Sequence, residues 1–130
     1  MKKSQLFAAG ILFFFVSCQE SRDKAFERLA KEYTAKCPIP LDAGIRVDSM
    51  VYDSKTNTNS NYYTISGNID NQDSIQKNKQ YMESSMIAAV KNSLDLKEYK
   101  DFNTTIEYVY FSEKSKKELF RIAIGPKLYK

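Results

Sequence analysis

Apolar and polar positions follow two rhythms along this chain, one with the spacing of a helix and one with the alternation of a strand. From Arg22 onward, apolar residues recur every three or four positions, at Phe26, Leu29, Ala30, Tyr33 and Cys37. This spacing predicts an amphipathic helix with one buried stripe. Pro38 and Pro40 follow directly and end the helix, because proline cannot donate to the helical hydrogen-bond ladder.

Strict alternation then indicates two strands joined by a polar stretch. Gly44–Tyr52 is predicted to be a strand with Ile45, Val47, Ser49 and Val51 on one face. Tyr62–Ile69 is predicted to be its partner, with Tyr63 and Ile65 on one face and Tyr62 and Thr64 on the other. The residues between them, Asp53–Asn61, are all polar and turn-forming, so we expect them to be the loop of a hairpin.

The helical rhythm returns after this hairpin and gives way to alternation once more. Ser74–Asp95 is predicted to be one long helix, and Asp73 with Gln76 resembles a capping box at its start. Thr104–Phe111 and Leu119–Ile124 alternate, which predicts a second hairpin closed by the charged loop Ser112–Glu118.

The order of these elements predicts the fold class. Helix, hairpin, helix, hairpin is two α-β-β units, and we expect an α+β domain over residues 25–130 with a four-stranded antiparallel sheet and both helices packed on one face. The element order resembles the β-lactamase-inhibitor-protein fold, which an outer-membrane assembly lipoprotein shares. The stretch Cys37–Asp53 is similar to one found in small uncharacterised exported bacterial proteins. Neither resemblance implies a functional residue.

The start of the chain has the pattern of an export signal. Lys2 and Lys3 precede the apolar run Leu6–Val16, which is shorter than the about 20 residues that span a bilayer. The residues at its end, Phe15-Val16-Ser17-Cys18, resemble the lipobox of bacterial lipoproteins, in which a small residue precedes an obligatory cysteine. Phe15 departs from that pattern, where leucine is commonest.

The lipobox resemblance implies a processed and lipid-anchored protein. Residues 1–17 would be a lipoprotein signal peptide, Cys18 would carry a diacylglycerol and an acyl chain such as palmitate, and residues 18–24 would be the lipidated N-terminus and a short tether. Two or more acyl chains anchor a protein stably. Gln19 stands where an aspartate retains some lipoproteins at the inner membrane, so the resemblance favours the bacterial outer membrane, at its periplasmic or its surface face. The alternative is a secreted protein in which Cys18 and Cys37 pair as a disulfide.

The face of the predicted sheet away from the helices is the candidate binding surface. It is expected to show Tyr62, Thr64, Ser66, Glu107, Val109, Phe111, Leu119 and Arg121. Aromatic residues and arginine are enriched where proteins bind one another. We therefore consider Tyr62, Thr64, Phe111 and Arg121 as partner-binding residues. The same residues could instead be covered by a helix or by a second copy of the chain.

The chain lacks the residues that the commonest kinds of catalytic site require. The chain contains no histidine, which excludes Ser-His-Asp and Cys-His catalysis and histidine-bound metals. Cys37 lies on the predicted apolar stripe and reads as a structural cysteine. Asp48, Asp53, Glu107 and Glu113 could pair for glycoside chemistry, although the sequence does not place them together. We expect no cofactor and no metal. The net charge of +4 is interspersed and falls when Lys2 and Lys3 are removed, which argues against nucleic-acid binding.

These observations favour a non-catalytic function. The leading hypothesis is a membrane-anchored lipoprotein that acts as a binding, inhibitory or assembly module on a protein partner in the envelope. The alternative is a small-ligand carrier or a carboxylate-based enzyme that uses the cleft between the sheet and the long helix. An enzyme would require convergent acids in that cleft.

Overall fold

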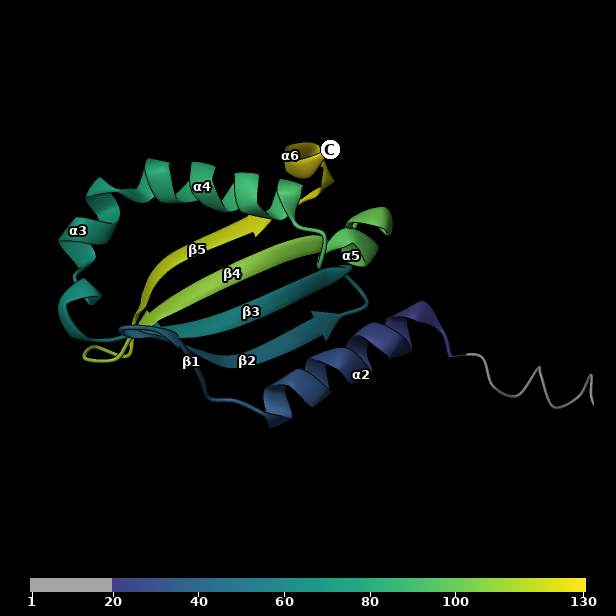
Figure 1. The fold of residues 1–130 in the computed structure, drawn as a ribbon, viewed down its shortest axis with the longest axis horizontal. Helices are drawn as coiled ribbons and strands as arrows, with labels where there is room; N and C mark the ends of the chain where they lie inside the picture. Colours follow the sequence, from purple (N-terminus) through teal and green to yellow (C-terminus); the bar gives the residue numbers. More distant parts are fainter. Residues whose placement is uncertain (1–19) are drawn as a thin grey trace, which may run out of the picture.

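One mixed β-sheet forms the centre of the molecule. The computed structural model describes residues 20–130, so the predicted signal peptide and Cys18 lie outside the described residues. The strands lie in the order β1-β2-β3-β4-β5, and every neighbouring pair is antiparallel except β3 and β4, which are parallel. Their bounds are Ile39–Asp42 (β1), Ile45–Asp53 (β2), Thr58–Ile65 (β3), Thr105–Ser112 (β4) and Glu118–Ile124 (β5) (Figure 1).

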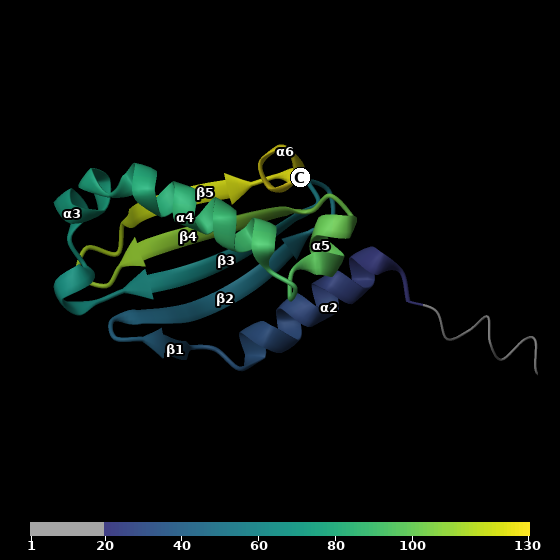
Figure 2. The same cartoon turned by 45° about the horizontal axis from the view of Figure 1, so that its top comes forward.

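The helices cover one face of this sheet. They are α2 (Arg22–Ala35), α3 (Gln72–Lys77), α4 (Lys79–Asn92), α5 (Lys97–Asp101) and α6 (Pro126–Tyr129), with a 3₁₀ turn η1 at Gly67–Ile69. Helix α2 packs along β2, whereas α4 packs over β5 and β4, and both lie on the same side (Figures 1 and 2). We call the covered side the helix-side face and the opposite side the open face.

The predicted four-stranded antiparallel sheet is wrong, although the class is α+β. The sheet has five strands, and its central pair is parallel over eight paired positions from Thr58↔Thr105 to Ile65↔Ser112. The cause is the connection between β3 and β4. It leaves the end of β3, passes through α3, α4 and α5, and returns to the opposite end of the sheet before β4 begins. A helical crossover of this kind makes the next strand parallel.

Strand β1 was hidden in the sequence by its prolines. Pro38 and Pro40 flank Ile39, and they were expected only to end the helix. Pro40 instead pairs with Arg46 at the sheet edge, where a missing backbone N–H is tolerated because no further strand needs it.

A β-bulge changes which side chains of β2 are buried. The register shifts between Val47 and Ser49, so Met50 and Tyr52 lie on the same face as Val47. Tyr52 is therefore 6% exposed and Val51 51% exposed, the reverse of what unbroken alternation predicts. A second shift between Tyr110 and Phe111 places Leu119 in the core rather than on the open face.

The predicted long helix is two helices. Helix α3 ends at Lys77 and α4 begins at Lys79, with Asn78 between them. The helix starts earlier than expected, because the side chain of Asn71 accepts a hydrogen bond of 3.0 Å from the backbone N–H of Ser74. Asn71, rather than Asp73, is the capping residue.

Two apolar clusters hold the helices to the sheet. Phe26 and Ala30 of α2 pack on Tyr52 of β2, and the Phe26 ring also lies 4.4 Å from the Tyr99 ring, centroid to centroid. The larger cluster lies under α3, α4 and α6 and contains Ile65, Ile75, Val90, Ile106, Leu119, Phe120, Ile122, Ile124 and Tyr129.

Candidate functional site

The structure brings the four predicted binding residues together on the open face. Thr64 of β3 lies beside Phe111 of β4, and Tyr62 lies in one row with Val109 and Arg121. The rings of Tyr62 and Phe111 are stacked at a centroid distance of 6.5 Å and an angle of 25°. Their role in binding a partner stays a prediction.

Two polar networks flank this aromatic pair. In the first, Arg46 forms ion pairs with Asp48 at 3.0 Å and with Glu113 at 3.2 Å, and the Thr64 hydroxyl donates a hydrogen bond to Asp48. The hydrogen bonds to Asp48 and then to Glu113 raise the pKa of Arg46. Both acids therefore neutralise an arginine on the surface.

The second network has the same construction on the other side of the pair. Arg121 forms ion pairs with Glu118 at 2.8 Å and with Glu107 at 3.1 Å, and the Ser60 hydroxyl donates to Glu107 at 2.9 Å. The charged groups of the open face thus satisfy one another, and Val109 beneath them is fully buried. A partner that used Arg121 would have to replace these bonds.

The helix-side face has an aromatic floor made by β3 and β4. The ring of Tyr63 is stacked on that of Tyr110 at 4.7 Å and 13°, and lies 6.1 Å from that of Tyr108. Burial raises the pKa of Tyr110 to about 12, with a smaller contribution from Tyr108. Burial, followed by the neighbouring Tyr110, raises the pKa of Tyr63 further. These phenols are therefore neutral at physiological pH.

A groove of about 440 Å³ opens at one end of this floor, between the sheet and helices α3 and α4. It exists because α2 packs on the Met50 and Tyr52 end of β2 and leaves the Ile45 end without a helix. Its lining is mostly apolar: Ile45, Ile65, Ile69, Ile75, Tyr81, Met82, Met86 and Tyr110, with Asn68, Ser74, Asn78 and Ser85.

Backbone geometry fixes the turn that lies beside the groove. Gly44, in the turn between β1 and β2, has a φ of +87°, and a Cβ there would lie 2.6 Å from the carbonyl oxygen of Ser66. The backbone N–H of Ser66 donates to the Gly44 carbonyl at 2.8 Å. Only glycine allows this approach, which holds the β1–β2 turn against η1 and its exposed Ile69.

The described lining of the groove carries no charged side chain: it contains no aspartate, glutamate, lysine or arginine. The acids considered for glycoside chemistry lie elsewhere: Asp48, Glu107 and Glu113 are ion-paired on the open face, and Asp53 accepts a hydrogen bond from the backbone of Lys55. What the groove can provide is apolar contact with a few neutral polar groups.

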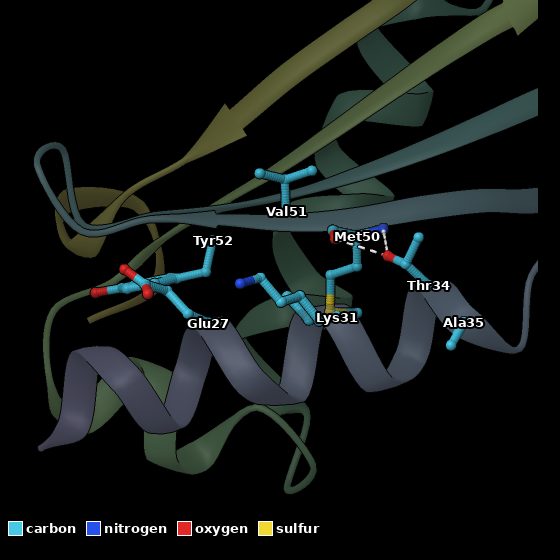
Figure 3. A pocket seen from close by; sticks show the side chains of 8 residues that line it. Glu27, Lys31, Thr34, Ala35, Met50, Val51 and Tyr52 are labelled. Carbon is cyan, nitrogen blue, oxygen red and sulfur yellow. Dashed lines mark hydrogen bonds between the residues drawn. The ribbon is translucent and has the colours of Figure 1, made fainter. Parts of the chain in front are cut away.

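A second pocket of about 600 Å³ lies between α2 and the edge of β2 (Figure 3). Strand β1 pairs only with the first part of β2, so Met50 lies beyond its reach. The Thr34 hydroxyl fills that place: it donates to the Met50 carbonyl at 2.8 Å and accepts from the Met50 N–H at 2.9 Å. Among the described residues that line it, Glu27 is the single carboxylate, whereas glycoside chemistry needs two.

Cys37 has the surroundings of a structural thiol. It is half-buried, and its thiol donates a hydrogen bond to the carbonyl of Tyr33 at 3.5 Å. Burial, and then the charge of Asp48, raises the pKa of Cys37, so the reactive thiolate is disfavoured. Within residues 20–130, no group of three or more acidic, cysteine or histidine side chains is arranged to hold a metal ion.

Comparison with known proteins places the fold. The model of a domain family described as a domain of unknown function (DUF8479) matches residues 21–120. The crystal structure of a "putative secreted protein" from Pseudomonas aeruginosa is similar over 86% of this chain and all of that one, with a TM-score of 0.71 and 13% identity. A pilotin from the type 2 secretion system of Vibrio vulnificus is similar over 83% of this chain and 91% of that one, with a TM-score of 0.62 and 11% identity. No curated protein has a significantly similar sequence.

The groove was only partly visible in the sequence. The sequence predicts the long helix and a cleft between it and the sheet, but it does not indicate which residues line that cleft. Tyr81, which is 75% exposed, lies outside the helical stripe. It was the available signal, because large apolar side chains outside the periodic stripe can belong to a binding surface.

Proposed function

The chain belongs to the DUF8479 family of domains, and from its geometry we propose that it is a non-catalytic assembly module of the bacterial envelope that binds an apolar segment of a partner protein. The groove between the sheet and helices α3 and α4 is the proposed site, and its neutral, largely apolar lining is the observation that carries the proposal. Apolar clefts that contain flexible methionine side chains adapt well to protein segments.

The structural neighbours support this function at the level of the fold. One is described as secreted, and the other is a pilotin of a secretion system. At 13% and 11% identity they share an architecture with this chain. An assembly role in the envelope agrees with both, and with the predicted lipoprotein signal.

The anchor is part of the proposal. Lipidation of Cys18 would tether the domain to a membrane, in the first place the outer membrane, while the globular part binds its partner. No helix within residues 20–130 is long and apolar enough to cross a bilayer. The lipid on Cys18 is the proposed attachment.

The open face is proposed as a second, weaker contact. Tyr62 and Phe111 offer a stacked aromatic pair, but Thr64 and Arg121 already have partners within the chain. A protein segment gains more from the groove, where burial of apolar surface requires no ion pair to break.

A pair of adjacent serines allows a matched test of the groove. Ser84 and Ser85 are both exposed on α4, and only Ser85 lines the groove. We expect Ser85→Arg to reduce recovery of the partner by about tenfold or more, because an apolar segment would have to desolvate the new charge. Ser84→Arg should leave recovery unchanged. The measurement is in-cell crosslinking of the tagged full chain, followed by mass spectrometry of the envelope fraction.

The outcomes separate the two surfaces. Equal thermal unfolding of both serine variants shows that the effect comes from the groove and not from misfolding. If Ser85→Arg keeps its partner while Tyr62→Ala and Phe111→Ala lose it, the open face is the site and the groove proposal is wrong.

A small-ligand carrier is the second candidate. The volume of the groove lies within the range of about 300–1,000 Å³ that is usual for small-molecule sites. A lipid or another apolar molecule that co-purifies in a stoichiometric amount with the native chain, and is lost in Ser85→Arg, would favour a carrier over a protein-binding module.

A further inference from the structure

The described chain begins at one end of the molecule, and the groove opens at the other. Helix α2 starts near α5, and α6 lies at the same end of the sheet, whereas η1, α3 and the β1–β2 turn lie at the far end (Figures 1 and 2). Strand β3 runs between the two ends, and eight residues of strand span about 26 Å. We call the first end the anchor-side end: residues 20–22, 54–57, 93–103 and 126–130.

Side-chain contacts join the segments of the anchor-side end into one surface. The guanidinium of Arg22 lies 4.4 Å above the ring of Phe102. Asn57 donates to the Phe102 carbonyl at 2.9 Å, which ties the β2–β3 turn to α5. Lys100 donates to the carbonyl oxygens of Val90 and Lys91, both at 2.9 Å, and so fixes α5 to the last turn of α4.

Helix α6 is held to the same surface. The hydroxyl of Tyr129 donates to the Thr104 carbonyl at 2.9 Å, and the ammonium of Lys130 donates to the side chain of Asn103. These contacts connect the start of α2 with α5, and α5 with α6.

This end displays apolar side chains that nothing in residues 20–130 covers. Leu94, between α4 and α5, is 86% exposed, and Leu128 of α6 is 46% exposed. Exposed lysines Lys97, Lys127 and Lys130 lie in the same segments, where Lys97 forms an ion pair with Asp101. Leucine beside lysine is the composition of surfaces that lie at a lipid–water boundary, where the apolar chain enters the acyl region and the ammonium meets a headgroup.

The chain length before Glu20 identifies the occupant. Cys18 precedes Glu20 by two residues, so their Cα atoms can be at most about 7 Å apart. That is less than the Debye length of about 8 Å at physiological ionic strength. A lipid on Cys18 would therefore hold Glu20, and with it the start of α2, within reach of the headgroup charges.

We propose that the anchor-side end rests on the membrane surface, with Leu94 and Leu128 at the lipid boundary and the lysines on anionic headgroups, so that the groove faces away from the membrane. This inference rests on the proposed lipid anchor at Cys18. It adds the orientation of the domain relative to the membrane, in which the groove lies on the side away from the lipid.

The test uses the lipidated full chain in vesicles of phosphatidylethanolamine and phosphatidylglycerol. In a Cys37→Ser background, Leu94→Cys carries an environment-sensitive fluorophore at the anchor-side end. Tyr81→Cys carries it at the groove as a matched control, since both positions are highly exposed. We expect quenchers on the lipid chains to reduce the fluorescence at position 94 several-fold more than at position 81.

Each outcome decides between the anchor and the orientation. If the intact mass shows the lipid and the protein floats with vesicles, but position 94 is quenched no more than position 81, the orientation is wrong and the anchor stands. If the label at position 94 leaves water only when a protein partner is added, the end binds protein and the orientation is again wrong. A chain without the lipid mass that does not float overturns both.

Discussion

At the scale of single residues, Thr34 determines how the sheet ends beside α2. Its hydroxyl makes both hydrogen bonds that a neighbouring strand would make with Met50, at 2.8 and 2.9 Å. An open strand edge is a template for unwanted pairing with other chains. Thr34 therefore stabilises the contact of α2 with β2 and also blocks the edge at the point where β1 no longer covers it.

Replacement of this hydroxyl tests both roles. Thr34→Val keeps the shape of the side chain but leaves the N–H and carbonyl of Met50 without a partner, and we expect it to lower the free energy of unfolding by about 1–3 kcal/mol. Urea unfolding followed by circular dichroism measures the loss. Thr34→Ser keeps the hydroxyl and should stay close to the original stability. Equal stability of the valine variant and the parent chain would contradict the assignment.

At the scale of elements, local patterns predicted the helices and strands better than their pairing. The apolar stripe of α2 and the alternation of β4 and β5 were visible, because each lies on one face of a regular element. The bulge in β2 was not, since one inserted residue exchanges the faces of Met50 and Val51 without changing the residue types. Strand direction was also hidden, because it depends on where the crossover returns and not on the strand itself.

Of the two candidate surfaces, the sequence predicted the open face but not the groove. The open face depends on alternation within β3 and β4, so Tyr62, Thr64 and Phe111 were placed on it correctly. The groove depends on how far α2 extends along β2, which is a property of the packed structure. A sequence pattern shows which face of a helix is apolar, but not which part of the sheet the helix leaves uncovered.

The tyrosine row on β3 and β4 predicts an alkaline limit to stability. The pKa of Tyr110 is raised to about 12 by burial, from the ordinary value of 10.0, and burial raises that of Tyr108 as well. Below about pH 10 the phenols are neutral in the folded and the unfolded chain, so their contribution is fully present. As the pH rises through 10 towards 12, only the unfolded chain ionises, and folding loses stability.

We expect this loss to be on the order of 1 kcal/mol for Tyr110, after allowance for its partial exposure. Unfolding in urea at about pH 8, at about pH 10, which is the ordinary pKa of tyrosine, and at about pH 11 measures this loss. The ultraviolet absorbance of tyrosinate reports whether the folded or the unfolded chain ionises. Tyr110→Phe should reduce the loss between pH 10 and 11 while changing stability little at pH 8. The same pH dependence in both chains would show that Tyr110 does not contribute.

At the scale of the whole molecule, the domain separates its two proposed contacts along the sheet. The anchor-side end and the groove lie at opposite ends of the strands (Figure 1). Charge alone does not favour one end, because ion pairs such as Lys97 with Asp101, at 2.6 Å, neutralise part of the basic surface. The orientation therefore depends on the shortness of the proposed tether more than on the affinity of the surface for lipid.

A longer tether separates these two contributions. A flexible insertion of about twenty residues after Gln19 gives a root-mean-square reach of about 25 Å, which frees the anchor-side end from the membrane. We expect the lipidated chain still to float with vesicles, while quenching of a label at position 94 falls towards that at position 81. Crosslinking to the partner should persist, because the groove belongs to the rigid domain and not to the tether. If position 94 stayed fully quenched, Leu94 and the lysines would bind lipid by their own affinity, and the short tether would not be what orients the molecule.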